Sequence, residues 1–589
     1  MALLLGAQTF VPSTLRRLLK GRIGVGTLMT IAAVGAVALG QVGEAAALAF
    51  LYSVSEGLEE YSIARTRRGL RALLDLVPPQ ATVSRDGAEQ VVAPAELRVG
   101  DILLVKPGER LATDGTIAAG RTALDVSAIT GESVPVEAGP GDAVYAGSIN
   151  GTGALTVTVT AAAADNSLAR IVAIVETEQA RKGASQRLAD RIAKPLVPGV
   201  MVVAALVAGI GALFGDDPLL WLERALVVLV AASPCALAIS VPVTVVAAVG
   251  AASRIGVLVK GGAALEALGT VRTVALDKTG TLTRNKPAVI DVAATRKATK
   301  EHVLALAAGL EARSEHPLAR AILAATTDRA AVADVNAVPG AGLEGLLEGR
   351  TVRLGRPGWI NAGPLAAEVA RMQHAGATAV LIEQAGEVIG AVAVRDELRP
   401  EVQEVIAQLS ASGYTTAMLT GDNLITATAL GQAAGITEVH ADLRPEDKAD
   451  IIRTLQGRSP TAMVGDGVND APALATADSG IAMGAMGSDV AIETADIALM
   501  GEDLNNLPQI LDHARRTRRI MLQNVGLSLA LIAVLIPLAL FGLLGLAAVV
   551  LIHELAEIVV IANGVRAGRI NRTTTPNAAQ PALMLEPTA

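Results

Sequence analysis

The chain has 589 residues, of which 51% are hydrophobic and only 18% are charged, and its mean hydropathy is +0.48. Such a composition is too apolar for a wholly soluble protein, and the length allows several domains. The net charge of −8 and the lack of basic stretches with interleaved aromatic residues argue against nucleic acid as a partner. The single cysteine, Cys235, excludes an internal disulfide framework and a Cys-x-x-Cys metal motif.

Apolar segments long enough to cross a bilayer come in pairs along the chain. We expect membrane helices at 23–43, 45–63, 195–215 and 225–253, and two more within 520–565, where Gly542 to Gly545 separates a hairpin. Glu56, Glu59 and Glu60 occupy the far end of the second segment, and prolines interrupt the fourth. The sequence therefore predicts a membrane protein with six helices.

Basic residues flank these helices on one side only. They are Arg16, Arg17, Lys20, Arg22, Arg65, Arg67, Arg68, Arg254, Lys260, Arg566 and Arg569. The short connection at residues 215–217 contains no Lys or Arg. By the positive-inside rule, a multi-pass protein of the cell membrane is expected, with both termini and both long inserts in the cytoplasm.

The two long inserts have the character of soluble domains. Residues 75–190 alternate valine-rich strands with Gly, Pro and Asp turns, which predicts a small β-rich domain. Residues 265–515 alternate short apolar strands with amphipathic helices, which favours a doubly wound parallel sheet. The expected domains are a basic segment at 1–22, membrane helices at 23–74, the β-rich domain at 75–190, membrane helices at 191–264, an α/β domain at 265–285 and 393–515, an inserted α+β domain at 286–392, membrane helices at 516–566 and a disordered tail at 567–589.

The most informative motif is Asp277-Lys278-Thr279-Gly280-Thr281-Leu282-Thr283, directly after the apolar strand Val271–Leu276. A carboxylate at the carboxyl end of a buried strand, followed by a lysine and small hydroxylated residues, is placed to attack a phosphoryl group. The motif resembles the phosphorylation motif of P-type ATPases. That resemblance implies Asp277 as the nucleophile that forms an aspartyl phosphate, with Thr279 beside it.

The tetrapeptide Thr130-Gly131-Glu132-Ser133 lies in the first insert. An exposed glutamate beside a glycine can orient a water molecule as a general base, although an isolated tetrapeptide of this kind is more often a surface turn. Its position between the second and third membrane helices resembles the dephosphorylation loop of the actuator domain in P-type ATPases. Glu132 is therefore expected to assist hydrolysis of the aspartyl phosphate.

Two further loops follow apolar strands of the second insert, at residues 420–423 and 465–470. Parallel strands deliver such loops to one edge of a sheet, where ligands usually bind. We expect Thr420, Asp422, Asp466, Asp470 and Lys448 to meet Asp277 there. Asp466 would hold Mg²⁺ with Asp277 and the backbone of Thr279, Asp470 would buttress the magnesium site, and Lys448 would neutralise phosphate oxygens. The three loops resemble the haloacid-dehalogenase-like core of P-type ATPases.

The inserted region contains two elements that suit a nucleotide. His316 precedes Pro317 at a helix start, and Gly340 and Gly342 allow close approach of the backbone. A lone His-Pro pair is more often a helix start without function. Together the two elements resemble the nucleotide-binding domain of heavy-metal P-type ATPases, and Glu311 fits the same pattern more loosely. The resemblance implies ATP as the nucleotide.

The fourth membrane segment carries Ser233-Pro234-Cys235 at its middle. Pro234 removes a helical hydrogen bond, and irregular backbone within a membrane is tolerated where it lines a cavity. Cys235 supplies a soft thiolate suited to transition metals, whereas a buried cysteine elsewhere is usually a small apolar residue. We expect Ser233 and Cys235 to contribute to a site for the transported ion.

The sixth helix adds His553, Glu554 and Glu557, ionisable groups that are costly inside a membrane and usually functional there. His553 and Glu557 share a helix face. The alternative is a cluster that reaches interfacial water. Ser-Pro-Cys combined with His-Glu resembles the subgroup of heavy-metal ATPases associated with cobalt, zinc or iron. The subgroup continues with His-Glu-Gly and has two further helices at its start, which residues 1–19 do not supply. The chain either begins further upstream or is a six-helix form.

These patterns predict an ATP-driven exporter of a divalent transition metal, cobalt or alternatively zinc, iron or nickel, with Mg²⁺ and ATP as cofactors. The cargo would enter near the glutamates at 56–60, and membrane lipid but no obligate partner chain is expected. Three alternatives remain: a zinc or cadmium exporter, a membrane-anchored phosphatase without transport, and the catalytic subunit of a potassium pump, which would have no thiol ligand.

Overall fold

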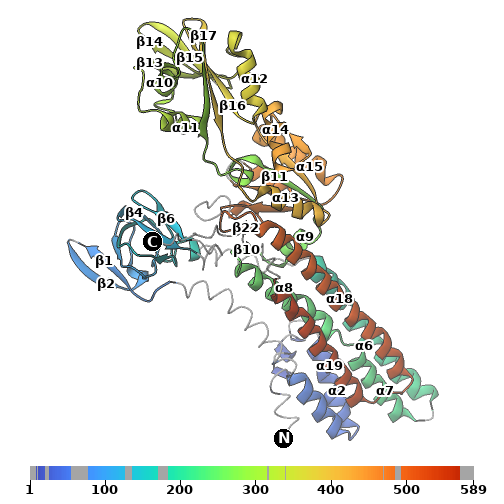
Figure 1. Cartoon of the computed structure of the whole chain (residues 1–589). Helices are drawn as coiled ribbons and strands as arrows, with labels where there is room; N and C mark the ends of the chain where they lie inside the picture. Colours follow the sequence, from blue (N-terminus) through green and yellow to red (C-terminus); the bar gives the residue numbers. More distant parts are fainter. Residues whose placement is uncertain are drawn as a thin grey trace, which may run out of the picture. The chain divides into compact units, whose positions relative to one another are not determined.

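The computed structural model describes residues 25–54, 77–85, 87–126, 135–169, 184–215, 217–314, 317–338, 340–467, 470–484 and 493–570, together with a few single positions before residue 25 and at 57. The chain divides into two compact units (Figure 1). The first unit contains residues 1–270 and 509–589, and the second contains residues 271–508.

Apolar helices dominate the first unit. They are α2 (Val25–Ala38), α6 (Ala184–Phe214), α7 (Pro218–Ala231), α8 (Cys235–Ser253), α18 (Asn506–Leu540) and α19 (Leu546–Val565), and a short helix α9 (Gly262–Leu268) follows α8. Among the described residues, four helical stretches are long and apolar enough to span a membrane: Leu196–Phe214, Pro218–Ser253, Asn506–Leu540 and Leu546–Gly568. Two shorter apolar helices, Gly26–Ala38 and Val42–Val54, correspond to the first predicted pair.

The fourth membrane segment is broken where the sequence places Ser233 and Pro234. Helix α7 ends at Ala231 and α8 begins at Cys235. The segment also starts earlier than the predicted residue 225, because Asp217 caps α7 by accepting hydrogen bonds from the amides of Leu219 and Leu220. A cap of this kind stabilises a helix by about 1 kcal/mol.

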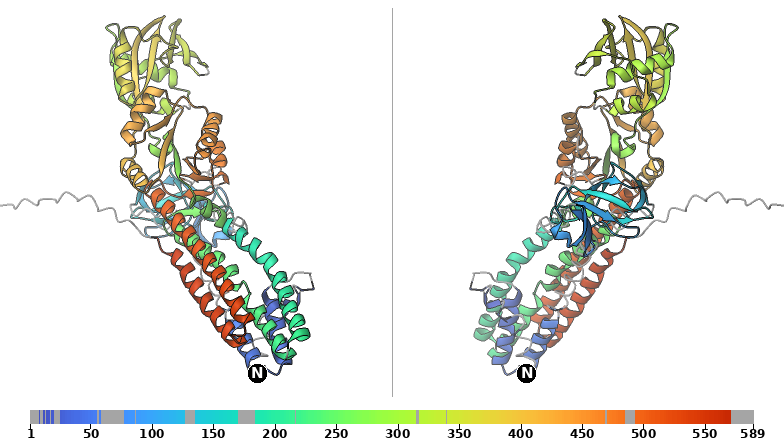
Figure 2. Two further views of the ribbon diagram at one scale, coloured as in Figure 1. Left: turned by 90° about the vertical axis from the view of Figure 1, so that its right-hand side faces the viewer. Right: turned by 90° about the vertical axis from the view of Figure 1, so that its left-hand side faces the viewer.

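The helices pack through small and branched apolar side chains. Leu237 and Val241 of α8 form a buried cluster with Met521 and Val525 of α18. Ala236 and Val243 of α8 contact Val560 of α19. The two views of Figure 2 show these long helices running side by side. Helix α8, which follows the break, is thus held by both α18 and α19.

The β-rich domain of the first unit consists of two antiparallel sheets. One has the strand order β2 (Ala88–Val92), β1 (Ala81–Arg85), β3 (Ile102–Val105), β9 (Leu155–Val159), β4 (Gly115–Ala119) and β7 (Ala143–Val144). The other has the order β6 (Val136–Ala138), β5 (Thr122–Asp125) and β8 (Ile149–Asn150). Alternate residues of β9 are buried, as a sheet with one face on a core requires.

The second unit contains a parallel sheet in the order β22 (Ile497–Leu499), β21 (Ser479–Ala482), β20 (Thr461–Gly465), β11 (Thr273–Asp277), β18 (Thr415–Leu419) and β19 (Glu438–His440). Helices α13 (Val402–Ala411), α14 (Leu424–Ala434), α15 (Pro445–Gln456) and α16 (Ala471–Thr476) connect its strands. Every residue of β11 is buried, as expected for the centre of a doubly wound sheet.

The inserted domain lies between β11 and α13 in the chain. Its antiparallel sheet has the order β12 (Ala288–Ala294), β17 (Glu387–Arg395), β16 (Thr378–Gln384), β15 (Arg350–Gly355), β14 (Gly342–Leu347) and β13 (Ala333–Val338). Helices α10 (Lys300–Glu311) and α11 (Pro317–Ala325) share one apolar cluster with this sheet, and α12 (Ala366–His374) shares another. The predicted α+β insertion into an α/β domain is confirmed.

Candidate functional site

Asp277 ends the central strand of the parallel sheet, and its side chain is buried. The Nζ atom of Lys448, on α15, lies 2.6 Å from Asp277 Oδ1 and 2.6 Å from Asp470 Oδ1. Asp470 comes from the loop after β20 and directly precedes α16. The structure therefore brings together the aspartate, the lysine and the second aspartate that the sequence predicts at this edge.

A glycine is required beside this cluster. A Cβ atom added at Gly465 would lie 2.5 Å from Asp470 Oδ2, which is closer than real side chains approach. Asp466, the next residue, lies beside the loop that follows Asp277, since a Cβ at Gly280 would be 3.7 Å from Asp466 Oδ2. The carboxylates of Asp466 and Asp470 both lie close enough to Asp277 for their charges to raise its pKa.

The loop after β11 folds back on Asp277. The amide of Thr279 donates to Asp277 Oδ2 over 2.9 Å, and Gly280 has φ of +75°, a conformation that favours glycine. Lys278 forms a 2.9 Å ion pair with Asp422, whose amide donates to Thr420 Oγ1 over 3.1 Å. Thr420 and Asp422 are thus held at the site through Lys278, a contact that the sequence did not reveal.

Burial and the charges of neighbouring groups shift the pKa values of Asp277, Asp470 and Lys448. Burial, together with the negative charge of Asp470, raises the pKa of Asp277 to about 7, against the opposing effect of Lys448. Burial also raises the pKa of Asp470. For Lys448, burial alone would lower the pKa, but the carboxylates of Asp277 and Asp470 outweigh it and raise the pKa above its usual value. The ammonium ion is therefore kept charged between two carboxylates.

The residues present suit Mg²⁺. Three carboxylates, those of Asp277, Asp466 and Asp470, act on one another as like charges, and Lys448 forms ion pairs with two of them. A divalent cation would compensate the excess negative charge, and Mg²⁺ is usually held by one or two carboxylates with water and phosphate oxygens. Asp277, Asp466 and the Thr279 carbonyl would hold it, and the bound ion would offset the charge of phosphate oxygens.

The candidate nucleotide residues lie in the inserted domain, but His316 and the side chain of Pro317 fall outside the described residues. Glu311 ends α10 and is buried. Gly340 has φ of +71°. A Cβ at Gly342 would lie 2.1 Å from the Leu354 carbonyl oxygen and 2.9 Å from the Trp359 ring. Packing against β15 and Trp359 therefore requires a glycine at 342, whether or not a nucleotide approaches it.

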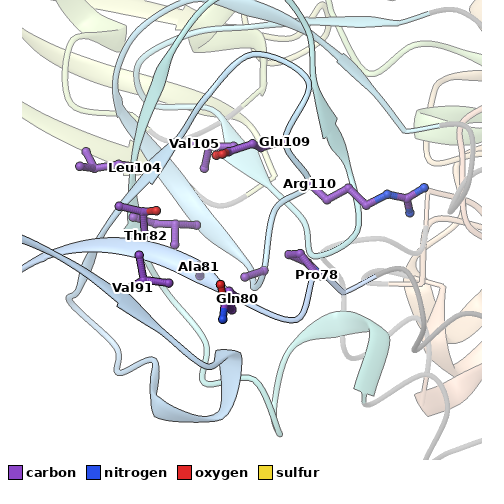
Figure 3. Close-up of a pocket in the computed structure, with 11 residues that line it drawn as sticks. Pro78, Gln80, Ala81, Thr82, Val91, Leu104, Val105, Glu109 and Arg110 are labelled. Atoms are coloured by element: carbon purple, nitrogen blue, oxygen red, sulfur yellow. The ribbon is translucent and has the colours of Figure 1, made fainter.

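Glu132 also lies outside the described residues. The β-rich domain that carries it has a cavity of about 380 Å³ along β1 and β3 (Figure 3). The polar side chains on its wall include those of Gln80, Thr82, Glu109 and Arg110. A second cavity, of about 690 Å³, lies in the inserted domain beside η4 (Gly363–Leu365). Neither cavity is lined by a predicted site residue.

In the membrane helices, His553 is buried and its Nε2 lies 3.0 Å from the carbonyl oxygen of Ala231, the last residue of α7. Since a carbonyl only accepts, Nε2 carries the proton in the neutral ring. Nδ1 is then left with a lone pair, and it is buried without a hydrogen-bond partner among the described residues. A histidine that donates one N–H to a backbone carbonyl is the usual arrangement of a metal ligand.

The other predicted ligands of the transported ion lie at the break before α8 and on α19. Ser233 is buried at the break, and Cys235 is the first residue of α8, although its side chain lies outside the described part of the chain. Glu557 is buried on the face of α19 that carries His553, and Glu554 is more exposed than either. Within the described residues, no three His, Cys, Asp or Glu side chains are arranged as ligands of one metal ion.

Two family models match the chain. Residues 75–176 match the P-type ATPase actuator domain, and residues 271–478 match the haloacid dehalogenase-like hydrolases. A cation-transporting ATPase G, named as probable, from Mycobacterium tuberculosis H37Rv is 72% identical over 576 residues, which is 98% of this chain and 75% of that protein. The chain belongs to the P-type ATPases. It is an ATP-hydrolysing cation translocase that uses Mg²⁺.

Further similarities narrow the family to the heavy-metal transporters. A cadmium-transporting ATPase from Staphylococcus aureus is 39% identical, with 97% of this chain and 81% of that protein covered. The crystal structure of a zinc-transporting PIB-type ATPase in an E2·Pi state has a TM-score of 0.60 and 37% identity, with 96% of this chain and 94% of that chain covered. The predicted membership in the heavy-metal P-type ATPases is thereby confirmed.

Proposed function

We propose that this ATPase exports a divalent transition metal from the cytoplasm and that Asp277 is the residue that is phosphorylated. The observation that carries the proposal is the buried cluster of Asp277, Lys448 and Asp470 at the end of β11. Lys448, held charged between the carboxylates, would face the phosphoryl group that Asp277 receives. The Thr279 amide would hold the carboxylate in position for the transfer.

The membrane site would bind the metal between the break of the fourth segment and α19. Cys235 offers a soft thiolate, His553 offers a free Nδ1, and Glu554 and Glu557 offer carboxylates. The relatives named for cadmium and the solved structure named for zinc support a divalent cargo of this softness. Zinc, cadmium and cobalt all suit this mixed set of ligands, with iron and nickel as further candidates. ATPase activity of the purified protein, measured across these ions, distinguishes them.

The orientation follows from the flanking arginines. We place both termini and both soluble inserts in the cytoplasm, where ATP is available. Metal would enter near Glu56, Glu59 and Glu60, and phosphorylation of Asp277 would favour the state in which the site opens outward. Labelling of a cysteine introduced at each terminus by a membrane-impermeant thiol reagent, compared between whole cells and broken cells, tests this orientation.

Glu132 is proposed to activate the water that removes the phosphoryl group. We expect Glu132→Gln to form the phosphoenzyme at the normal rate but to release phosphate at least about 10-fold more slowly, because an amide cannot act as the general base. Labelling with γ-labelled ATP followed by a chase with unlabelled ATP measures the decay. Glu137→Gln, at an exposed position of strand β6 five residues further along the chain, is the matched control. A decay rate equal to that of the control would leave Glu132 as a turn residue.

Glu557 is proposed to set the preference among metals. If its carboxylate binds the cargo, Glu557→Ala should shift the order of activation away from harder ions and toward cadmium, since a carboxylate favours harder ions than a thiolate does. The ratio of ATPase activation by cobalt and by cadmium is the measurement. Leu555→Ala, an exposed residue of the same helix, is the control. An unchanged ratio in Glu557→Ala would assign this glutamate to helix packing alone.

A membrane-anchored phosphatase without transport is the competing function, since the haloacid dehalogenase-like core alone can support it. The match to an actuator domain and the buried His553 against a broken helix favour the transporter. The phosphatase would need neither.

A further inference from the structure

The segment that follows the inserted domain binds the phosphorylation loop, residues 278–283, through Arg399. Arg399 lies just after β17, and its side chain is only 7% exposed. Its backbone amide donates to the Leu282 carbonyl over 2.9 Å, its Nε to the Thr281 carbonyl over 3.0 Å and its Nη2 to the Gly280 carbonyl over 3.1 Å. One residue thus satisfies three consecutive carbonyls of the loop that follows Asp277.

These contacts fix the direction of the loop's peptide groups. In a trans peptide the C=O and N–H bonds point to opposite sides. Because the Gly280 and Thr281 carbonyls face Arg399, the N–H groups of the same peptide units face away from it. The Thr279 amide, which donates to Asp277 Oδ2, belongs to the peptide unit of Lys278, whose carbonyl accepts from the Thr283 amide. Arg399 therefore holds the part of the loop between Thr279 and Thr283, on which the position of both of these bonds depends.

A second contact holds the end of the loop. Asp396 accepts a hydrogen bond of 2.5 Å from Thr283 Oγ1 and one of 3.0 Å from the Lys286 amide. These bonds join the chain entering the inserted domain to the chain leaving it. The backbone that carries Arg399 is therefore held in place beside the loop by the hydrogen bonds of Asp396.

The remaining nitrogen of Arg399 reaches another part of the chain. Nη1 lies 3.2 Å from Glu502 Oε2, and Glu502 is 69% exposed, whereas Arg399 is buried. Glu502 belongs to the short segment directly before α18, the long helix that continues into the apolar bundle. A partly exposed ion pair is weak and can break, whereas buried hydrogen bonds to a charged group are stronger. The hydrogen bonds of Arg399 to the loop carbonyls are therefore stronger than its ion pair with Glu502.

We propose that Arg399 is a positioning residue for phosphoryl transfer and that its pair with Glu502 links the state of the Asp277 loop to the segment leading into α18. This inference rests on the proposed phosphorylation of Asp277. The buried hydrogen bonds of Arg399 to the loop carbonyls keep the loop in its reactive conformation through the cycle. The ion pair with Glu502 forms or breaks when Asp277 receives a phosphoryl group.

The experiment uses the full-length protein in detergent or lipid with Arg399→Gln, Arg399→Lys and Glu502→Gln. Arg458→Gln and Glu446→Gln serve as controls, because Arg458 forms an exposed ion pair and Glu446 is exposed on α15 of the same domain. The rate of phosphoenzyme formation is normalised to the number of nucleotide-binding sites and followed with its KM for ATP. The fraction of phosphoenzyme that returns its phosphoryl group to added ADP is measured as well.

Arg399→Gln should form phosphoenzyme at least about 10-fold more slowly with an unchanged KM for ATP, since loop geometry and not nucleotide binding is altered. Arg399→Lys keeps the charge but not the planar fork of donors, so its rate should fall about threefold or more. A role in folding alone would reduce the number of binding sites without changing the normalised rate. If Arg399→Gln does not fold, Arg399→Lys decides, and a folded lysine variant that reacts at the control rate overturns the positioning role.

Glu502→Gln should form phosphoenzyme at the control rate, but the fraction that still reacts with ADP should rise by about threefold or more, because the coupled change in conformation is delayed. A fraction equal to that of Glu446→Gln overturns the link to α18. Label that persists in Asp277→Asn would instead overturn the proposed phosphorylation site, so the two failures are distinguishable.

Discussion

Asp277→Asn should abolish both ATP hydrolysis and acid-stable labelling from γ-labelled ATP. The amide cannot act as the nucleophile, so no covalent phosphoenzyme forms, and activity should fall by on the order of 10³-fold or to background. Labelling of purified protein followed by acid precipitation measures the loss. Because Asn is similar in size to Asp, Lys448 keeps its ion pair with Asp470 and the site retains its packing.

The stability of this variant provides an internal control. Since the folded protein raises the pKa of Asp277 to about 7, ionisation of this carboxyl in the folded state costs stability as the pH rises from about 4 to 7, and the full cost is present above pH 7. Asp277→Asn removes that cost. Without Mg²⁺, the variant should therefore melt no lower than the wild type at pH 8, and the two should converge near pH 4. Persistent labelling in a variant that melts normally would contradict the assignment of Asp277.

The cluster around Asp277, the proposed phosphorylation site, could be predicted from sequence because its parts follow a simple geometric rule. Asp277 ends an apolar strand, Asp422 and Asp466 follow shortly after two others, and strands of a parallel sheet end at one edge. The register places Asp277 directly beside Leu419 of β18. Local patterns alone therefore bring together residues that are almost 200 positions apart.

Contacts made by residues outside such patterns could not be predicted. Arg399 lies in an irregular segment after β17, and nothing in its neighbourhood indicates that it binds the carbonyls of Gly280 and Thr281. The sequence predicts His553 as a ligand, but the hydrogen bond of its Nε2 to the Ala231 carbonyl depends on where α7 ends. Both contacts depend on tertiary packing, which sequence periodicity does not encode.

The glycines of the inserted domain also show what a sequence pattern does not reveal. The sequence predicts that Gly340 and Gly342 allow a nucleotide to approach, yet a glycine at 342 is already required by the neighbouring strand and by Trp359. A glycine in a sequence indicates that something comes close to the backbone but does not identify what comes close. Glu132, His316 and the Cys235 thiol lie outside the described residues, so their roles stay predictions.

Cys235→Ala should separate the transporter from an anchored phosphatase. If the thiolate is a ligand, its loss should reduce metal-stimulated ATPase activity by about 100-fold or more while ATP binding is unchanged, because a methyl group cannot replace a soft ligand and an incomplete site cannot trigger phosphorylation. Metal-dependent phosphate release and nucleotide affinity are measured on the same preparation.

The matched control is Ser240→Ala, which removes a buried hydroxyl from the same helix, where Ser240 Oγ donates to the Leu237 carbonyl. It should keep metal stimulation within about twofold of the wild type, since a hydroxyl bonded to its own helix contributes little net energy. Cys235→Ser should fall between the two, because an oxygen ligand is harder than a thiolate and holds soft ions less well. Phosphate release at the full rate without metal in Cys235→Ala would contradict the transport function. In a pump, ATP hydrolysis depends on binding of the transported ion, whereas a phosphatase has no such requirement.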